Sequence, residues 1–456
     1  MKLTASRWAV GGGTTAEWKA VMRRRVDQAL GELGAARAAW RGAPAEARRA
    51  GFDRGLAYFL SRRGSERDRL ASHPCFDYWL YLYRKHFELP AAAHDWRLHY
   101  GMFQSFPATL AARRGETLTL EGALDPDGRF FFYGTPWYLE FEGGRAGDKV
   151  ELSIARGGVT AVGPKRQKAE FSLKTSADET GPLKKLLEVR PGLVVDDVSW
   201  LTTHGIVMHG LLRLSPRQKR DFAEPIARAL DDLKDREPLL ADEIFDLVRV
   251  LVPLQNSRDH GSVSSSYATL RGLIALSPSQ DALLQAETII HEFCHCKANQ
   301  LLAVDPGLRP GQSGQVFYSP WRPDARRLRG LWLGAHAFLN VARYLARSLE
   351  REEYEAQRRI EVMVNVARRV EQVEDALRCV SSYGSLTPFG AELLLEMWRQ
   401  LAAVRHAIQW FPQALLEQQR SIHGAHRAEH ALGSTGFHRD AGLQDRVRRP
   451  RFTASQ

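Results

Sequence analysis

The chain has 456 residues, of which 44% are hydrophobic and 26% charged, and its formal net charge is +11. This length favours two or three domains, and the composition is typical of a globular protein outside the membrane. No apolar run is long enough to span a bilayer, and the first residues lack the apolar segment of a signal peptide. We therefore expect a cytoplasmic protein with no membrane partner, whose four cysteines are reduced rather than paired in disulfides.

The positive charge comes mostly from arginine and favours acidic partners, from nucleic acid to an acidic peptide. Basic and acidic residues are nevertheless interspersed, as in ALDDLKDREPLLADEIFDL, and we find no helix-turn-helix, zinc-finger or RNP-like signature. We predict a solvated, arginine-rich surface and no nucleic-acid partner.

Four regions follow one another along the chain. Residues 1–110 are expected to be helical, because TAEWKAVMRRRVDQALGELGAARAAW is amphipathic and CFDYWLYLYRKHFELP is rich in aromatic residues. Residues 111–200 are expected to be β-rich, since short apolar runs alternate with Asp-Gly, Gly-Thr-Pro and Gly-Gly. Residues 201–420 are expected to form a catalytic domain, and 421–456 a flexible basic tail.

The expected catalytic domain begins with a helix, SPRQKRDFAEPIARALDDLKD, followed by strands in VRVLVPL and GLIALS. The next helix is expected to start at a capping box with proline, residues 277–280, and to stop at residues 305–307. Two long helices and a further one starting at Thr387-Pro388 complete the domain. The predicted fold class is α+β, mostly helical, with a β-rich central region and a zincin-like HExxH helix beside a small sheet.

The stretch AETIIHEFCHCKANQLL carries the HExxH motif. His291 and His295 are four residues apart, so on a helix they share one face and can bind one metal ion. Glu292 lies about 100° away around the helix and is the base that activates water in zincins. The strand GLIALS could be the edge strand that holds an extended substrate. The alternative is a pair of core histidines without metal.

A catalytic metal site of this kind needs a third ligand from elsewhere in the chain. Cys294 and Cys296 point away from the histidine face and are interpreted as small buried apolar residues. The best candidate is His336, a single histidine in the apolar sequence GLWLGAHAFLNVARYL. The alternatives, which would make a gluzincin-like site, are glutamates of the following segment: Glu352, Glu353 and Glu361.

Three segments together resemble the bacterial HExxH-motif peptide-modification family, whose members are encoded with ribosomally made, post-translationally modified peptides. They are IIHEFCHCKANQLL, VFYSPWRPDARRLRGLWLGAHAFLNVARYL and SLTPFGAELLLEM, and the resemblance extends over about residues 75–405. It implies that the partner is a precursor peptide. It also implies an Fe(II)- and 2-oxoglutarate-dependent hydroxylation of the β-carbon of a peptide residue.

The resemblance also implies roles for individual residues. His291, His295 and His336 would hold the iron, and Glu292 would orient groups around it. Arginine suits the distal carboxylate of 2-oxoglutarate, and the matching positions are Arg322 and Arg326, with Tyr318 and Trp321 lining the pocket. Many members of the family carry a histidine where Leu333 stands here, about one helical turn before His336.

Two alternatives remain open at this stage. The same residues could bind Zn²⁺ with Glu292 activating water, which would make the protein a zinc peptidase. The chain could also be a non-catalytic peptide-binding protein in which the metal site is degenerate. The sequence makes no prediction of the oligomeric state.

Overall fold

The computed structural model of the protein describes residues 16–40, 52–87, 95–174, 179, 181–206, 210–256, 262–309, 315–351 and 354–430. Two compact units are present, and neither is continuous in sequence. The sheet unit contains Trp18–Asp231 and Ile244–Thr288, and the motif unit includes Asp232–Glu243 and the described residues from Ile289 onward. Helices and several small sheets together confirm the α+β class. Among the described residues, no helix has the length and apolar character needed to cross a membrane.

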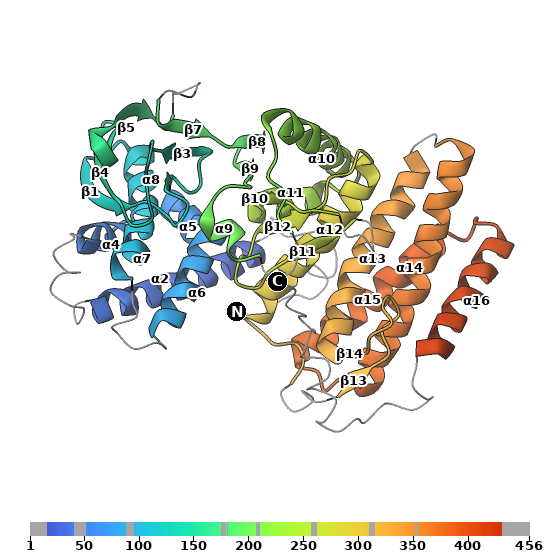
Figure 1. The fold of residues 1–456 in the computed structure, drawn as a ribbon. Coiled ribbons are helices and arrows are strands. Elements are labelled where there is room, and N and C mark those ends of the chain that lie inside the picture. Colours follow the sequence, from blue (N-terminus) through green and yellow to red (C-terminus); the bar gives the residue numbers. More distant parts are fainter. Residues whose placement is uncertain are drawn as a thin grey trace, which may run out of the picture. The chain divides into compact units, whose positions relative to one another are not determined.

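The described parts of residues 1–110 form helices, as predicted, and nearly all of them belong to the sheet unit (Figure 1). Their aromatic side chains pack into one core: Phe76 lies between Phe59, at 5.6 Å between ring centroids, and Phe106, at 5.0 Å. Burial of such rings is the main favourable contribution to the folding of this part. The helices are α2 (Ala16–Trp40), α4 (Phe52–Ser61), α5 (Ser65–Ala71), α6 (Pro74–Phe87), α7 (Trp96–Phe103) and α8 (Ser105–Arg114).

Two antiparallel sheets confirm the β-rich region. The four-stranded sheet has the order β1 (Leu118–Ala123), β4 (Lys149–Ala155), β5 (Gly158–Val162), β6 (Lys168–Ser172). Along β4 exposed and buried side chains alternate, as expected for a strand with one face on the core. The three-stranded sheet has the order β2 (Arg129–Phe131), β3 (Trp137–Glu140), β7 (Leu183–Lys185).

The third sheet of this unit contains the strand that precedes the motif helix. Its order is β11 (Ser264–Ser266), β12 (Leu273–Leu276), β10 (Val250–Pro253), β9 (Leu193–Val195), β8 (Leu187–Arg190). β12 pairs with β10 on one side and β11 on the other. The prediction of an edge strand in GLIALS is therefore wrong: the backbone groups of β12 that would pair with a substrate are bonded to its two neighbours. All four residues of β12 are buried, as in a central strand.

Helix α10 (Pro216–Arg236) confirms the helix predicted to begin the region after residue 200, whereas α11 (Pro238–Leu247) was not predicted. Each of the two helices contains a boundary between the two units. The motif helix α12 (Ala282–Leu302) starts four residues later than the predicted capping box. The side chain of Asp281 accepts hydrogen bonds from the backbone N–H groups of Leu283, at 3.0 Å, and Leu284, at 3.2 Å. Asp281 therefore caps the helix, and an aspartate at this position is among the best caps.

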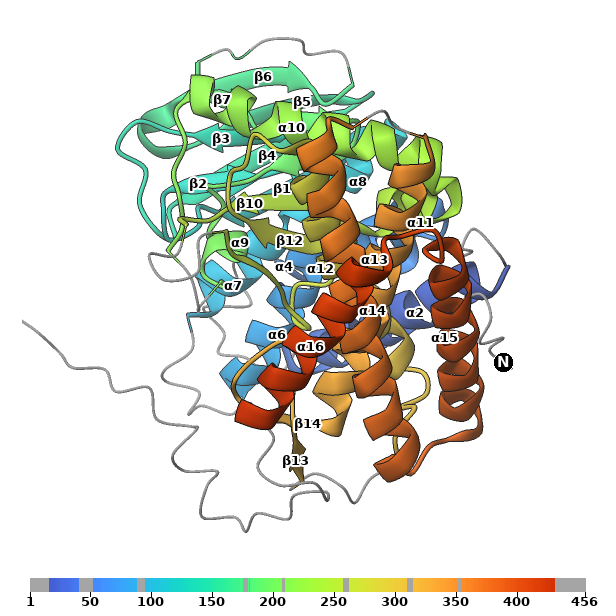
Figure 2. The same cartoon turned by 90° about the vertical axis from the view of Figure 1, so that its right-hand side faces the viewer.

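The motif unit continues with the short strands β13 (Val316–Phe317) and β14 (Arg326–Arg327) and then four long helices. These are α13 (Leu328–Arg351), α14 (Ala356–Tyr383), α15 (Pro388–Ala407) and α16 (Gln413–His430), and Figure 2 shows them side by side. The predicted start at Thr387 is confirmed, since its hydroxyl accepts the N–H of Gly390 at 3.0 Å. It also donates to Asp305 at 2.7 Å, which joins the end of α12 to the start of α15.

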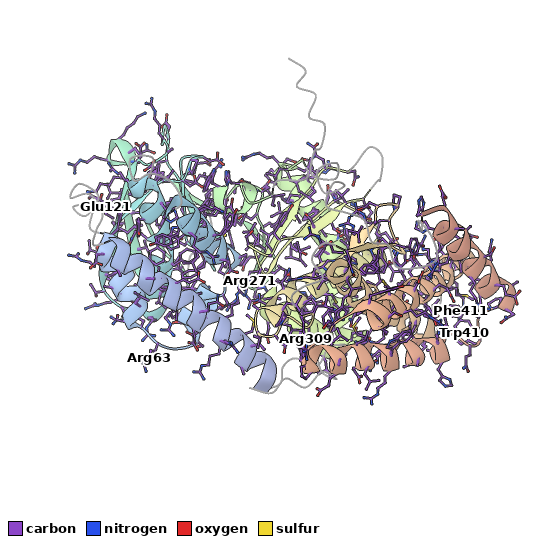
Figure 3. The ribbon with its side chains drawn as sticks, turned by 90° about the horizontal axis from the view of Figure 1, so that it is seen from below. Arg63, Glu121, Arg271, Arg309, Trp410 and Phe411 are labelled. Carbon is purple, nitrogen blue, oxygen red and sulfur yellow. The ribbon has the colours of Figure 1, made fainter. Side chains whose placement is uncertain are left out.

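The predicted boundary of the C-terminal tail is wrong. α16 continues to His430, so residues 421–430 are helical, and the rest of the predicted tail lies outside the described residues. α16 packs on α14 through His423, whose Nε2 is 3.1 Å from an oxygen of Asp375. Between α15 and α16, Phe411 is buried and the neighbouring Trp410 is 50% exposed (Figure 3).

Candidate metal centre

The two motif histidines face each other on α12. Their Nε2 atoms are 3.0 Å apart and their rings are nearly perpendicular, with centroids 4.6 Å apart. Both side chains are half-buried, so the pair is shielded by protein yet remains reachable from solvent. Two imidazole nitrogens at this separation can both lie about 2.1 Å from one ion, the usual metal–nitrogen distance.

The environment keeps both imidazoles in the form that binds metal. Burial, the neighbouring His295 and the guanidinium of Arg369 hold the pKa of His291 well below its usual value. Burial also lowers the pKa of His295, against the opposing effect of the Glu292 carboxylate. A neutral imidazole has a free nitrogen lone pair, and no proton must leave before a metal binds.

Buried charges flank the pair on α12 itself. Glu292 is 4% exposed, and its carboxylate acts to raise the pKa of His295. On another face of the helix, the ammonium of Lys297 bonds to the carboxylate of Glu243 at 2.7 Å, and both side chains are almost fully buried. This ion pair attaches the motif helix to α11. It restricts rotation of α12 and so helps to fix the direction in which the histidines point.

A wall of aromatic and basic side chains covers His291. The ring of Phe338, on α13, lies 4.5 Å from the imidazole, and the guanidinium of Arg369, on α14, lies 4.1 Å from the centre of the Phe338 ring. Arg369 donates to the side chain of Gln372 at 3.0 Å. Gln372 in turn donates to the carbonyl of Pro320 at 2.9 Å, which joins α14 to the segment before β14.

Trp321 completes this wall. Its ring centroid lies 5.2 Å from that of Phe338, and the ring packs on Gly334 so closely that a Cβ there would be 2.2 Å from it. The glycine of the GAHAFLNVA segment is thus needed for the close approach of Trp321. The predicted place of Trp321 near the site agrees with this contact, whereas Phe338 and Arg369 were missed. Phe338 lies in the segment that carries the family resemblance, but Arg369 has no local signal in so arginine-rich a chain.

Among the described residues, His336 does not join the histidine pair in a group that could hold a metal ion. His336 is buried and lines a small apolar cavity of about 20 Å³ beside the C-terminal half of α12. Leu333, the position where the family often has histidine, lines the same cavity, together with Ala298, Leu301, Leu302, Trp332, Phe389 and Leu393. Ala298 is one helical turn beyond His295, so the cavity begins about 5 Å along the helix from the pair.

The other predicted ligands are also elsewhere. Within the described residues, no three His, Cys, Asp or Glu side chains are close enough together to hold a metal ion. Glu361 is exposed and pairs with Arg358 at 3.1 Å, while Glu352 and Glu353 lie outside the described residues. Cys294 and Cys296 are buried, and burial raises the pKa of Cys294 to about 12, so this residue is a thiol rather than a thiolate ligand.

The predicted cosubstrate residues lie in the segment of β13 and β14, and each contacts a residue other than the histidine pair. Arg322 and Arg326 both bind Asp324, each at 2.9 Å, and the Arg322 side chain is 57% exposed. The hydroxyl of Tyr318 is 2.6 Å from Nδ1 of His426, so this residue contacts α16. The arginine that influences His291 electrostatically is Arg369.

His291 and His295 by themselves provide two of the protein ligands that a metal site needs. Two neutral imidazoles provide two ligands, and the remaining positions are open to water, cosubstrate and substrate. Comparison of the chain with protein-family models and with curated proteins gives no match.

Proposed function

We propose that the chain is a cytoplasmic metal enzyme that modifies a ribosomally made peptide by Fe(II)- and 2-oxoglutarate-dependent hydroxylation of a β-carbon. The observation that carries the metal is the 3.0 Å separation of the two Nε2 atoms in a shielded site. The peptide and the cosubstrate come from the resemblance of the motif segments to the peptide-modification family. The four cysteines are free thiols, which suits a reducing compartment.

The residues of the site have separate roles in this proposal. His291 and His295 hold the iron, which together with 2-oxoglutarate supplies the oxidising chemistry when both are bound. Glu292 orients groups around His295 from its buried position. Phe338 and Trp321 exclude water from one side of the pair, and Arg369 provides the positive charge for a carboxylate of the cosubstrate.

The direct test is a spectrum of the Fe(II)-loaded protein under anaerobic conditions. Addition of 2-oxoglutarate is expected to produce a visible charge-transfer band that is absent from the His291→Ala variant. α16 offers a matched control: His426 and His430 have the same spacing, are also half-buried, and have ring centroids 4.5 Å apart. Replacing both with alanine should leave the band intact. Absence of the band in the wild-type protein would overturn the oxygenase proposal.

Arg369→Gln is expected to weaken 2-oxoglutarate binding roughly 10- to 100-fold, the usual range for losing a hydrogen bond to a charged group. The band intensity measured against cosubstrate concentration gives this affinity. Arg322→Gln is the control, because Arg322 is exposed and paired with Asp324, and a change below about twofold is expected there. If 2-oxoglutarate binding is weakened by Arg322→Gln but not by Arg369→Gln, the sequence-based prediction that Arg322 binds the cosubstrate would be supported instead.

A zinc peptidase is the second candidate, and the buried Glu292 beside His295 favours it. In that case Glu292→Gln should reduce peptide cleavage by about 10²- to 10⁴-fold while zinc remains bound, since a general base contributes that much. In the oxygenase the same variant should still bind iron and 2-oxoglutarate. Mass spectrometry of a peptide encoded next to the enzyme distinguishes the two, as hydrolysis shortens the peptide and hydroxylation adds one oxygen atom.

A further inference from the structure

The turn between β5 and β6 in the sheet unit has an unusual backbone. The N–H of Gly163 donates to the carbonyl of Gln167 at 2.9 Å, and the N–H of Gln167 donates to Pro164 at 3.1 Å. The two residues between them, Lys165 and Arg166, have φ values of 53° and 57°. Positive φ at both central positions is the mark of a type I′ hairpin turn, which strongly favours Asn and Gly. Lysine and arginine are strained there, and strained residues cluster at functional sites.

The surroundings hold this strained turn in place. The side chain of Gln167 accepts the N–H of Glu142 at 3.0 Å and donates to its carbonyl at 2.9 Å. Gly163 lies against the ring of Phe141, where a Cβ would be 2.7 Å from the ring atoms. The turn is thus fixed at its base, and the two cations extend from a backbone that does not need to reorganise on binding.

Lys165 and Arg166 border a surface depression of about 340 Å³, within the size range of small-ligand sites. The rest of the lining comes from the ends of β4 and β5 and the turn: Asp148, Lys149, Glu151, Val162, Gly163 and Pro164. Lys149 is engaged by Glu121, labelled in Figure 3, at 2.8 Å and by Glu151 at 3.1 Å. Lys165 and Arg166 are exposed, and neither has an ion pair or side-chain hydrogen bond with any residue that the structure describes.

We infer that this depression binds acidic side chains of the peptide substrate, through Lys165 and Arg166. The lysine provides a point charge and the arginine a planar fork that matches a carboxylate. Asp148 and Glu151 also line the depression, and Glu151 is paired with Lys149 at 3.1 Å, so Lys165 and Arg166 are the cations left to bind an added carboxylate. The choice of a peptide as ligand rests on the proposed function, whereas the anion site rests on the turn alone.

The test exchanges the turn for one with preferred residues, in the metal-free full-length protein. Lys165→Asn combined with Arg166→Gly removes both cations and relieves the strain at both positions. We expect binding of a fluorescein-labelled hexaglutamate peptide, measured by anisotropy at about 50 mM salt, to weaken about tenfold or more. The thermal unfolding temperature should rise by roughly 2–4 °C. Weaker binding together with higher stability would indicate that Lys165 and Arg166 serve ligand binding at a cost in stability.

The hairpin between β4 and β5 provides the control. Its turn contains Arg156, with φ 51°, followed by Gly157, so the same kind of strained cation lies in the same sheet but away from the depression. Arg156→Asn should raise stability and leave hexaglutamate binding unchanged. Equal loss of binding in both variants would overturn the site, since general surface charge would then explain it. Inorganic phosphate or a single-stranded DNA oligonucleotide that competes as well as the peptide would overturn the assignment to carboxylates.

These outcomes are independent of the metal centre. Hexaglutamate binding that depends on Lys165 and Arg166 supports the site even if no iron or zinc binds at His291 and His295. If the proposed function is disproved, only the identification of the modified peptide as the natural ligand is lost, and the anion site remains. A metal-binding protein with no difference between the turn variant and wild type would overturn the inference and leave the metal proposal in place.

Discussion

Replacing His291 or His295 with alanine is expected to lower the affinity of the protein for Fe(II) or Zn²⁺ by more than about a hundredfold. Loss of an outer-shell partner of a ligand already costs 10- to 100-fold, and each of these variants loses one of the two protein nitrogens that face each other. The measurement is metal content after dialysis against a graded series of chelators. The His426→Ala, His430→Ala double variant should keep the same tightly bound metal as wild type.

Stability of the metal-free protein separates a ligand from an ordinary core histidine. Nδ1 of His291 is buried and has no hydrogen-bond acceptor or donor among the described residues. His291→Leu removes this unsatisfied group, so the free energy of unfolding without metal should stay equal or increase. A core histidine satisfied by its neighbours would instead lose stability on this change. A large loss in His291→Leu, together with weak metal retention in wild type, would contradict the metal centre.

Lys297→Met is expected to destabilise the protein by about 3–5 kcal/mol, the cost of removing one partner of a buried ion pair. The carboxylate of Glu243 is fully buried, and the ammonium of Lys297 lies 2.7 Å from it. The substitution keeps the length and apolar character of the side chain but leaves this carboxylate without the attraction of that cation. Urea denaturation followed by the fluorescence of the tryptophans measures the change as a shift of the midpoint.

The double variant Lys297→Met, Glu243→Gln should recover a large part of this loss, because the remaining amide carries no charge. Lys168→Met is the surface control: Lys168 and Glu170 form an ion pair with both side chains more than half exposed, and a change within about 1 kcal/mol is expected. Equal losses of stability in Lys297→Met and Lys168→Met would show that the Lys297–Glu243 ion pair is no more important for stability than a surface ion pair. The metal affinity of Lys297→Met, measured at low denaturant, then reports whether the Lys297–Glu243 ion pair also fixes the orientation of His291 and His295.

The sequence by itself determined the local features of this protein. The helices from α12 to α15 follow from apolar periodicity and from the cap at Thr387, and the β-rich region follows from its alternation and turn residues. The juxtaposition of His291 and His295 is equally local. A separation of four residues on a helix brings two side chains to one face whatever surrounds them, so the shared face of His291 and His295 could be anticipated from the motif.

The tertiary structure decided everything that depends on partners distant in sequence. The arginine that acts electrostatically on His291 is Arg369. Arg322 and Arg326 instead form ion pairs with Asp324, which is close to both in sequence. His336 was a reasonable third ligand by composition, yet its place on α13 turns it toward the apolar cavity beside Ala298.

Strand order is decided in the same way. β12 has the composition of a buried strand, but only its pairing with both β10 and β11 shows that it is no edge. The physical reason is common to these cases. Periodicity and caps act over a few residues along the chain, whereas the choice of one arginine among many, or of one neighbour for a strand, is made by packing between segments that the sequence leaves far apart.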